Sequence, residues 1–195
     1  MATPDRTVPD TELMQRAIAG DRDAYAELFQ RNSGRVGRVA YLLLHDSSAA
    51  EDIVQETFTR GLDRIRTCRG ETPPGAWFCA IGLNLCRRAL RDRRRREDSA
   101  EPDELESARA VGAPRRGVVT SVARRETSRR LVIALGCLTG RQREVFVLHY
   151  VEELPYDIIG RMLSITPDAA RALAHRARSV LQERFPNHIP GTLDS

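Results

Sequence analysis

Hydrophobic residues recur along this chain with the spacing of amphipathic helices. Apolar residues fall three and four positions apart in one segment after another, and no stretch alternates apolar and polar residues long enough to suggest a strand. The pattern therefore predicts an all-α protein. The expected helices and apolar stripes cover residues 13–18, 24–29, 36–44, 49–66, 75–96, 127–138, 141–151, 155–163 and 167–184.

The helical pattern lapses once, in a stretch that opens with acidic residues and continues with glycine and proline. Such a composition is typical of a linker. At 195 residues the chain is long enough for two compact helical bundles. We therefore expect a first helical domain over residues 9–96, a flexible linker over residues 97–125 and a second helical domain over residues 126–186.

Capping signals mark several of the expected helix boundaries. Asp21 is placed to cap the helix that follows it, and Thr139 and Gln142 have the spacing of a capping box. Thr166 and Pro167 supply an N-cap and a proline at the first helical position. The last two helices are thus expected to meet across a tight turn, which is the arrangement of a helix-turn-helix.

The last expected helix has one apolar face and one basic face. The apolar face holds Ala169, Ala170, Leu173, Ala174, Ala177, Val180 and Leu181. The other face holds Arg171, Ala172, His175, Arg176, Arg178, Ser179 and Gln182. A basic helix behind a tight turn suits the major groove of DNA. A solvated face on an ordinary helix gives the same periodicity, so the turn alone favours the DNA interpretation.

The helix expected at residues 49–66 carries an outward row of acidic and polar residues. Its wheel places Asp52, Gln55, Glu56, Thr59 and Asp63 outward. It places Val54, Phe58, Leu62 and Ile65 inward. Such a row repels DNA but can pair with arginines of another protein. A surface that only keeps the protein soluble is an equal alternative on these grounds.

The next helix, at residues 75–96, changes from apolar to strongly basic along its length. Trp77, Phe78, Ile81, Leu83 and Leu85 come first. Seven arginines then fall among the last ten residues, relieved only by Asp92. This density of cations costs self-repulsion unless a polyanion screens it, which favours contact with nucleic acid over a frayed helix end.

Composition excludes several classes of function. The net charge is +4, and all 31 basic residues are arginine, for which GC-rich coding is a sufficient explanation. The four cysteines show no CxxC spacing, and the histidines are isolated, so we expect no metal site, no cofactor and no catalytic constellation. No signal peptide is evident, and the longest apolar run, residues 39–44, is too short to cross a bilayer. A soluble cytoplasmic protein with no membrane insertion is expected.

Three motifs resemble the sigma-70 family of bacterial RNA polymerase sigma factors. EDIVQETF at residues 51–58 resembles the AEDLVQETF signature of region 2.2. AWFCAIGLN at residues 76–84 is similar to the AWLxxIARN stretch of regions 2.3 and 2.4. LTGRQREVF at residues 138–146 and LPYDII at residues 154–159 resemble the opening of region 4. The length leaves no room for regions 1.1 and 3, which indicates the small extracytoplasmic-function group.

This resemblance implies a function and a set of site residues. It implies contacts with the polymerase β′ subunit at Asp52, Gln55, Glu56 and Phe58. It implies contacts with the promoter −10 element at Trp77, Asn84, Arg87, Arg88 and Arg91. It implies contacts with the −35 element at Arg171, His175, Arg176 and Arg178. Ala172 and Leu173 stand where the family usually has serine and arginine, which shifts the expected −35 binding toward phosphate contacts.

The implied partners are core RNA polymerase, through its β′ and β subunits, promoter DNA and an anti-sigma factor. The chain is expected to direct promoter-specific transcription initiation without catalysis of its own. A stand-alone helix-turn-helix regulator, which would bind duplex DNA without polymerase, stays open as the alternative. An enzyme is the least favoured class, because no phosphate loop or nucleophile–base pair is evident.

Overall fold

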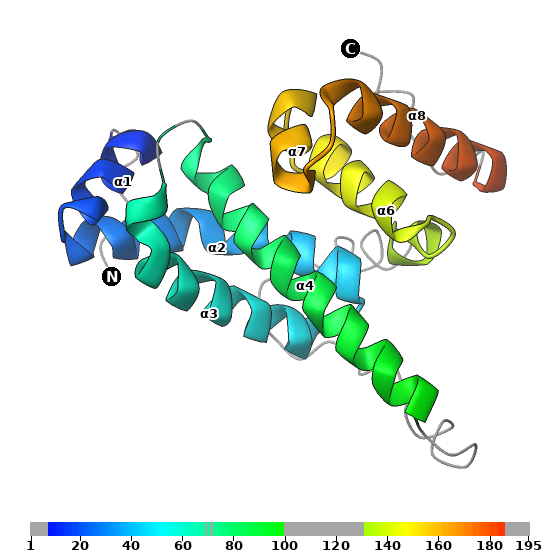
Figure 1. Cartoon of the computed structure of the whole chain (residues 1–195), viewed down its shortest axis with the longest axis horizontal. Coiled ribbons are helices and arrows are strands. Elements are labelled where there is room, and N and C mark those ends of the chain that lie inside the picture. Colours follow the sequence, from blue (N-terminus) through cyan, green and yellow to red (C-terminus); the bar gives the residue numbers. More distant parts are fainter. Residues whose placement is uncertain (1–7, 69, 71, 100–130, 186–195) are drawn as a thin grey trace. The chain divides into compact units, whose positions relative to one another are not determined.

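The structure is a computed structural model that describes residues 8–68, 70, 72–99 and 131–185 (Figure 1). Helices dominate these residues and none of them forms a strand, so the all-α prediction is confirmed. The chain divides into two compact units, residues 1–115 and residues 116–195. The bounds expected for the two domains stay a prediction, because most of the linker expected at residues 97–125 lies outside the described residues.

The described residues of the first unit form a helical bundle in which α2, α3 and α4 pack against one another and α1 packs on α2 (Figure 1). The helices are α1 (Asp10–Ile18), α2 (Arg22–Leu44), α3 (Ser47–Arg64) and α4 (Pro74–Ser99). A short 3₁₀ turn, η1 (Ile65–Thr67), follows α3. Helix α4 continues three residues past its expected end at residue 96, into the stretch expected to be linker.

Helix α2 joins two segments that the sequence pattern separated. The apolar stripes at residues 24–29 and 36–44 belong to one continuous helix, because tertiary packing outweighs the low helix propensity of Gly34 between them. Asp21 caps the helix as expected, since its carboxylate accepts a hydrogen bond from the Ala24 amide at 3.0 Å. The helix ends at Leu44 and is capped by His45, which adopts a left-handed conformation with φ 60°.

A cluster of aromatic rings forms the centre of the first unit. Phe58 of α3 packs against Phe29 of α2 and Phe78 of α4, with ring centroids 4.8 Å and 4.5 Å apart respectively. The Tyr25 hydroxyl donates a hydrogen bond to the backbone carbonyl of Phe58. Gly61 lets these helices approach closely, because a Cβ at this position would lie 2.9 Å from the Phe78 ring. The three long helices are therefore fixed relative to one another.

The second unit holds a described helical segment at residues 131–135, followed by four named elements. These are α6 (Gly140–Phe146), the π-helix η3 (Val147–Val151), α7 (Tyr156–Leu163) and α8 (Pro167–Arg184). The expected capping box is present: the Thr139 hydroxyl accepts from the Gln142 amide, and the Gln142 side chain accepts from the Thr139 amide. The single helix expected at residues 141–151 is instead α-helical only as far as Phe146.

A tight turn joins α7 to α8, as the capping signals predict. Ser164 ends α7 in a left-handed conformation with φ 55°, and the Thr166 hydroxyl accepts from the Ala169 amide at 3.1 Å. Gly160 permits the turn to fold back, because a Cβ there would lie 2.7 Å from the Ile165 carbonyl oxygen. Ala170, Ala174, Ala177 and Leu181 bury the inner face of α8.

Candidate functional site

One face of α3 presents polar and acidic side chains to solvent. We call this surface the acidic ridge, and its exposed members are Asp52, Gln55, Glu56, Thr59 and Asp63. All five were expected outward. Arg60 Nε donates to Glu56 Oε1 at 2.6 Å, so one of the ridge carboxylates already has a cation beside it. Both side chains of this pair remain partly exposed, at 36% and 47%. A guanidinium group of a partner can therefore still reach Glu56.

Phe58 lies inward on α3, as its periodicity predicts, which conflicts with its implied role as a contact, and Leu62 does not lie inward as expected. Phe58, implied as a polymerase contact, is only 4% exposed and belongs to the aromatic core, so its side chain is not part of the ridge surface. Leu62, expected inward, is 53% exposed at the end of the ridge. The cause is that Ile53, Thr57 and Gly61 form the buried stripe of α3, which turns Leu62 outward.

Helix α4 brings most of the residues implied in −10 binding onto one stripe. Trp77, Asn84, Arg88 and Arg91 fall within a sector of about 60°, because they are spaced seven, four and three residues apart. Arg95 continues this stripe. Arg87 lies about 80° to one side of Trp77, and its guanidinium reaches the Asn84 side-chain oxygen at 3.5 Å. The stripe begins with a half-buried aromatic ring and ends with cations.

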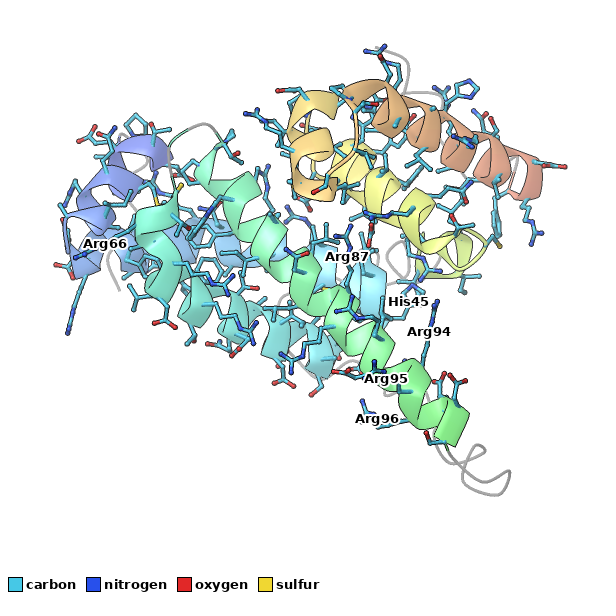
Figure 2. All side chains as sticks on the ribbon, viewed as in Figure 1. His45, Arg66, Arg87, Arg94, Arg95 and Arg96 are labelled. Atoms are coloured by element: carbon cyan, nitrogen blue, oxygen red, sulfur yellow. The ribbon has the colours of Figure 1, made fainter. Side chains whose placement is uncertain are left out.

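The C-terminal part of α4 extends beyond the rest of the bundle (Figure 1). Residues 91–99 are all exposed. Figure 2 shows Arg94, Arg95 and Arg96 projecting from this part of the helix in different directions. Two ion pairs offset some of the charge, Arg88 with Asp92 at 3.8 Å and Arg93 with Glu97 at 3.0 Å. These pairs are exposed, so they screen the arginines only weakly.

On α8, Arg171, His175 and Arg176 are exposed and Arg178 is half-buried, and the arginines are divided between two flanks. Ala172 and Ser179 lie opposite the buried alanines, at the centre of the exposed face. Arg171 and Arg178 lie on one flank, and Arg176 lies on the other, roughly 140° around the helix from Arg171. A helix in the major groove would direct such flanks toward the two phosphate backbones, and Ala172 offers no hydrogen bond to a base.

Two family models match the chain. The model described as sigma-70 region 2 matches residues 28–96, and the model described as sigma-70, region 4 matches residues 128–181. RNA polymerase sigma factor CarQ from Myxococcus xanthus is 34% identical over 180 residues, which cover 87% of this chain and 94% of CarQ. The chain belongs to the extracytoplasmic-function group of the sigma-70 family. It is thus a sigma factor, which binds core RNA polymerase and directs transcription initiation at promoters.

Another relative and two solved structures are also similar to this chain. The ECF RNA polymerase sigma factor SigW from Bacillus subtilis is 26% identical over 177 residues, which cover 85% of this chain and 91% of SigW. The structure of CnrH in complex with the cytosolic domain of CnrY has the same fold, with a TM-score of 0.69, 23% identity, and coverage of 91% of this chain and 97% of CnrH. The sigma factor RpoE in complex with the anti-sigma factor NepR from Bartonella quintana superposes with a TM-score of 0.60 and 21% identity, over 80% of this chain and 94% of that chain.

The described residues contain neither a candidate metal site nor a candidate membrane span. Within residues 8–99 and 131–185, apart from positions 69 and 71, no three histidine, cysteine or acidic side chains are grouped to hold a metal ion. No helix in this part of the sigma factor combines the length and hydropathy of a membrane span.

The sequence did not indicate the aromatic surroundings of Arg171, a residue implied in −35 binding. Its guanidinium lies 5.5 Å from the centroid of the Tyr156 ring and 3.4 Å from Asp168 Oδ1. Tyr156 also stacks on His149, which the sequence analysis treated as isolated. The i,i+3 spacing of Asp168 and Arg171 could have indicated their ion pair. No spacing signal predicts the ring contacts, because His149 lies within the π-helix and Tyr156 and Arg171 lie on different helices.

Proposed function

We propose that the sigma factor docks on core polymerase through the acidic ridge and on promoter DNA through α4 and α8. The observation that carries this proposal is the separation of charge within one bundle. Carboxylates line the exposed face of α3, while arginines line the exposed stripe and free end of α4. Surfaces of opposite sign suit different macromolecules, because like charge against the wrong partner is strongly unfavourable.

The acidic ridge is proposed to bind arginines of the polymerase β′ subunit with Asp52, Gln55 and Glu56. Leu62 adds an exposed apolar side chain at the end of the same surface. An apolar residue beside charged pairs can supply burial, whereas the carboxylates supply register and a fast encounter. Phe58 supports the ridge from within the core instead of touching the partner.

The DNA surfaces are proposed to divide the promoter between the two units. Trp77 and Asn84 face the unpaired bases of the −10 element, and Arg87, Arg88 and Arg91 hold its backbone. Arg171, Arg176, Arg178 and His175 bind the −35 duplex, mainly at phosphates. Neither surface needs a cofactor or a catalytic step, because binding energy against unpaired bases can drive strand opening.

Charge reversal tests the polymerase surface. The double variant Asp52→Arg/Glu56→Arg is expected to lose core polymerase binding in a pull-down, while its −35 duplex binding is kept. The matched control Glu12→Arg/Asp23→Arg changes the same charge at exposed positions on α1 and α2 and is expected to bind normally. Unchanged run-off transcription by the α3 variant would defeat the assignment of the ridge.

Substitution of Arg171 tests the −35 surface. Arg171→Ala is expected to weaken −35-dependent initiation and leave core binding intact, because its side chain is 65% exposed and contributes little to the core. Equal loss of both activities would indicate misfolding. A stand-alone regulator would bind duplex DNA but would neither bind core polymerase in the pull-down nor support initiation.

We further propose that an anti-sigma factor controls this protein. Both would act in the bacterial cytoplasm, where RNA polymerase works. The support is the fold shared with RpoE, whose solved structure is a complex with the anti-sigma factor NepR. An anti-sigma factor would have to cover the ridge or the DNA surfaces. We expect a purified partner to block core polymerase binding in competition, and a partner that binds without such competition would contradict this part of the proposal.

A further inference from the structure

The chain leaves α-helical geometry between α6 and α7. Residues Val147–Val151 form a π-helix, after which the Leu154 amide bonds to the Leu148 carbonyl at 3.0 Å. Glu153 has φ 54°, a left-handed conformation that is uncommon for a residue other than glycine. A π-helix is rare, and it often marks a functional position. Here it changes the direction of the side chains that lead to α7.

The π-helix places His149 against Tyr156, the first residue of α7. The two rings are stacked, with centroids 4.1 Å apart and planes inclined by 26°. His149 Nδ1 lies 3.0 Å from the Leu154 carbonyl oxygen, a contact that fixes the orientation of the imidazole. Tyr156 is therefore held by a side chain that is itself held by the backbone.

Tyr156 in turn contacts Arg171 of the DNA-facing helix. The Arg171 guanidinium carbon lies 5.5 Å from the centroid of the Tyr156 ring, within the range of a cation–π interaction. Asp168 Oδ1 lies 3.4 Å from a terminal nitrogen of the same guanidinium. Burial raises the pKa of the Tyr156 hydroxyl, so the ring stays neutral at physiological pH. An arginine that is 65% exposed is thus restrained from two sides.

Such restraint matters because a free arginine side chain has many rotamers to lose when it binds DNA. A residue that holds the guanidinium in its binding orientation before DNA arrives lowers this entropic cost. A cation–π contact at an exposed site corresponds to an effect of about two- to fivefold on affinity.

We propose that Tyr156, supported by His149, is a positioning residue that presets Arg171 for the −35 duplex. This rests on the proposed role of Arg171 at the −35 element and deepens it. The ring acts through its aromatic face, so the hydroxyl, which is hydrogen-bonded to Tyr150, is not needed to hold Arg171. The competing explanation is that Tyr156 binds a phosphate directly through its hydroxyl, and it predicts the opposite behaviour of Tyr156→Phe.

The contact can be measured in the free protein by NMR of the full chain. The side-chain protons of Arg171, assigned by their loss in Arg171→Ala, are expected upfield of those of Arg176, because they lie over a ring. Tyr156→Phe is expected to keep this shift, and Tyr156→Leu to abolish it. If Arg171 in the unmodified chain shows no upfield shift relative to Arg176, the proposal is overturned, whether or not the Leu variant folds.

The consequence is measured with a double-mutant cycle on holoenzyme binding to a −35 duplex. Tyr156→Leu is expected to weaken binding about two- to fivefold and to have no further effect in the Arg171→Ala background. Tyr156→Phe is expected to bind as tightly as the unmodified chain. An equal loss from Tyr156→Leu in both backgrounds, or a loss in Tyr156→Phe, would overturn the positioning role. If Arg171→Ala alone leaves −35 binding unchanged while the ring shift is present, the proposed function of Arg171 fails instead.

Discussion

The rings of Phe58 and Phe78 pack with their centroids 4.5 Å apart, so the helix with the acidic ridge and the helix with the arginine stripe share one core contact. The two proposed binding surfaces of the first unit therefore depend on the same packing contact in the core. A change in this contact should affect both surfaces, whereas a change on either surface should affect one partner.

Phe58→Ala is expected to lower the free energy of unfolding by about 3–5 kcal/mol, because it opens a cavity among three helices. Chemical denaturation of the purified protein measures this loss. Both polymerase binding and −10 binding should fall together with stability, and Phe58→Leu should lose less of each. A Phe58→Ala variant that is stable but fails only with polymerase would show that the side chain contacts the partner directly.

Leu62→Ala is expected to weaken core polymerase binding by about 1–2 kcal/mol, because the leucine would bury apolar surface in the complex. Titration of labelled sigma factor with core polymerase measures the affinity. The free energy of unfolding should change by less than about 0.5 kcal/mol, since the side chain is 53% exposed in the free chain. A large loss of stability with unchanged affinity would contradict the placement of Leu62 on the docking surface.

Arg91→Gln and Arg95→Gln should reduce the salt dependence of promoter binding. The slope of log affinity against log salt concentration is negative. Each lost phosphate contact reduces its magnitude by about 0.9 for duplex DNA, or about 0.7 for a single strand. Affinity measured at several salt concentrations gives this slope. Arg22→Gln, an exposed arginine at the start of α2, is the matched control and should leave the slope unchanged. Equal slopes in all variants would exclude phosphate contacts at Arg91 and Arg95.

Asp21→Ala should destabilise the first unit in a pH-dependent way. The backbone hydrogen bond from Ala24, followed by that from the Arg16 side chain, lowers the pKa of Asp21 below its ordinary value of 3.8. The stabilisation is therefore present above about pH 4 and is lost as the pH falls through the lowered folded-state pKa. Denaturation midpoints should differ between Asp21→Ala and the unmodified chain at pH 7 and converge at low pH.

Asp21→Asn separates the cap from the charge. Asparagine caps helices as well as aspartate does, so this variant should keep most of the stability at pH 7. Its midpoint should follow pH less steeply than that of the unmodified chain, because the titrating carboxylate is gone. If the difference in denaturation midpoint between Asp21→Ala and the unmodified chain is as large at low pH as at pH 7, the carboxylate charge contributes nothing to stability.

Local signals in the sequence were reliable where the interaction itself is local. Asp21, the Thr139–Gln142 capping box and the Thr166 cap lie where spacing predicted them, because each bond joins residues at most three positions apart. The alternation of buried alanines and exposed polar residues on α8 was equally readable. The acidic ridge could be read for the same reason, since a helix fixes the relative directions of its own side chains.

Residue patterns alone were enough to predict the helical class, the main helix boundaries, the family and the sign of charge on each exposed face. The tertiary structure was needed to show that α2 is continuous, that Leu62 is exposed, and that Arg171 lies against Tyr156. Periodicity gives the direction of a side chain relative to its own helix. Which of two adjacent stripes is buried depends on the neighbouring helices, and on α3 the small residue Gly61 brings the Phe78 ring close enough to settle it.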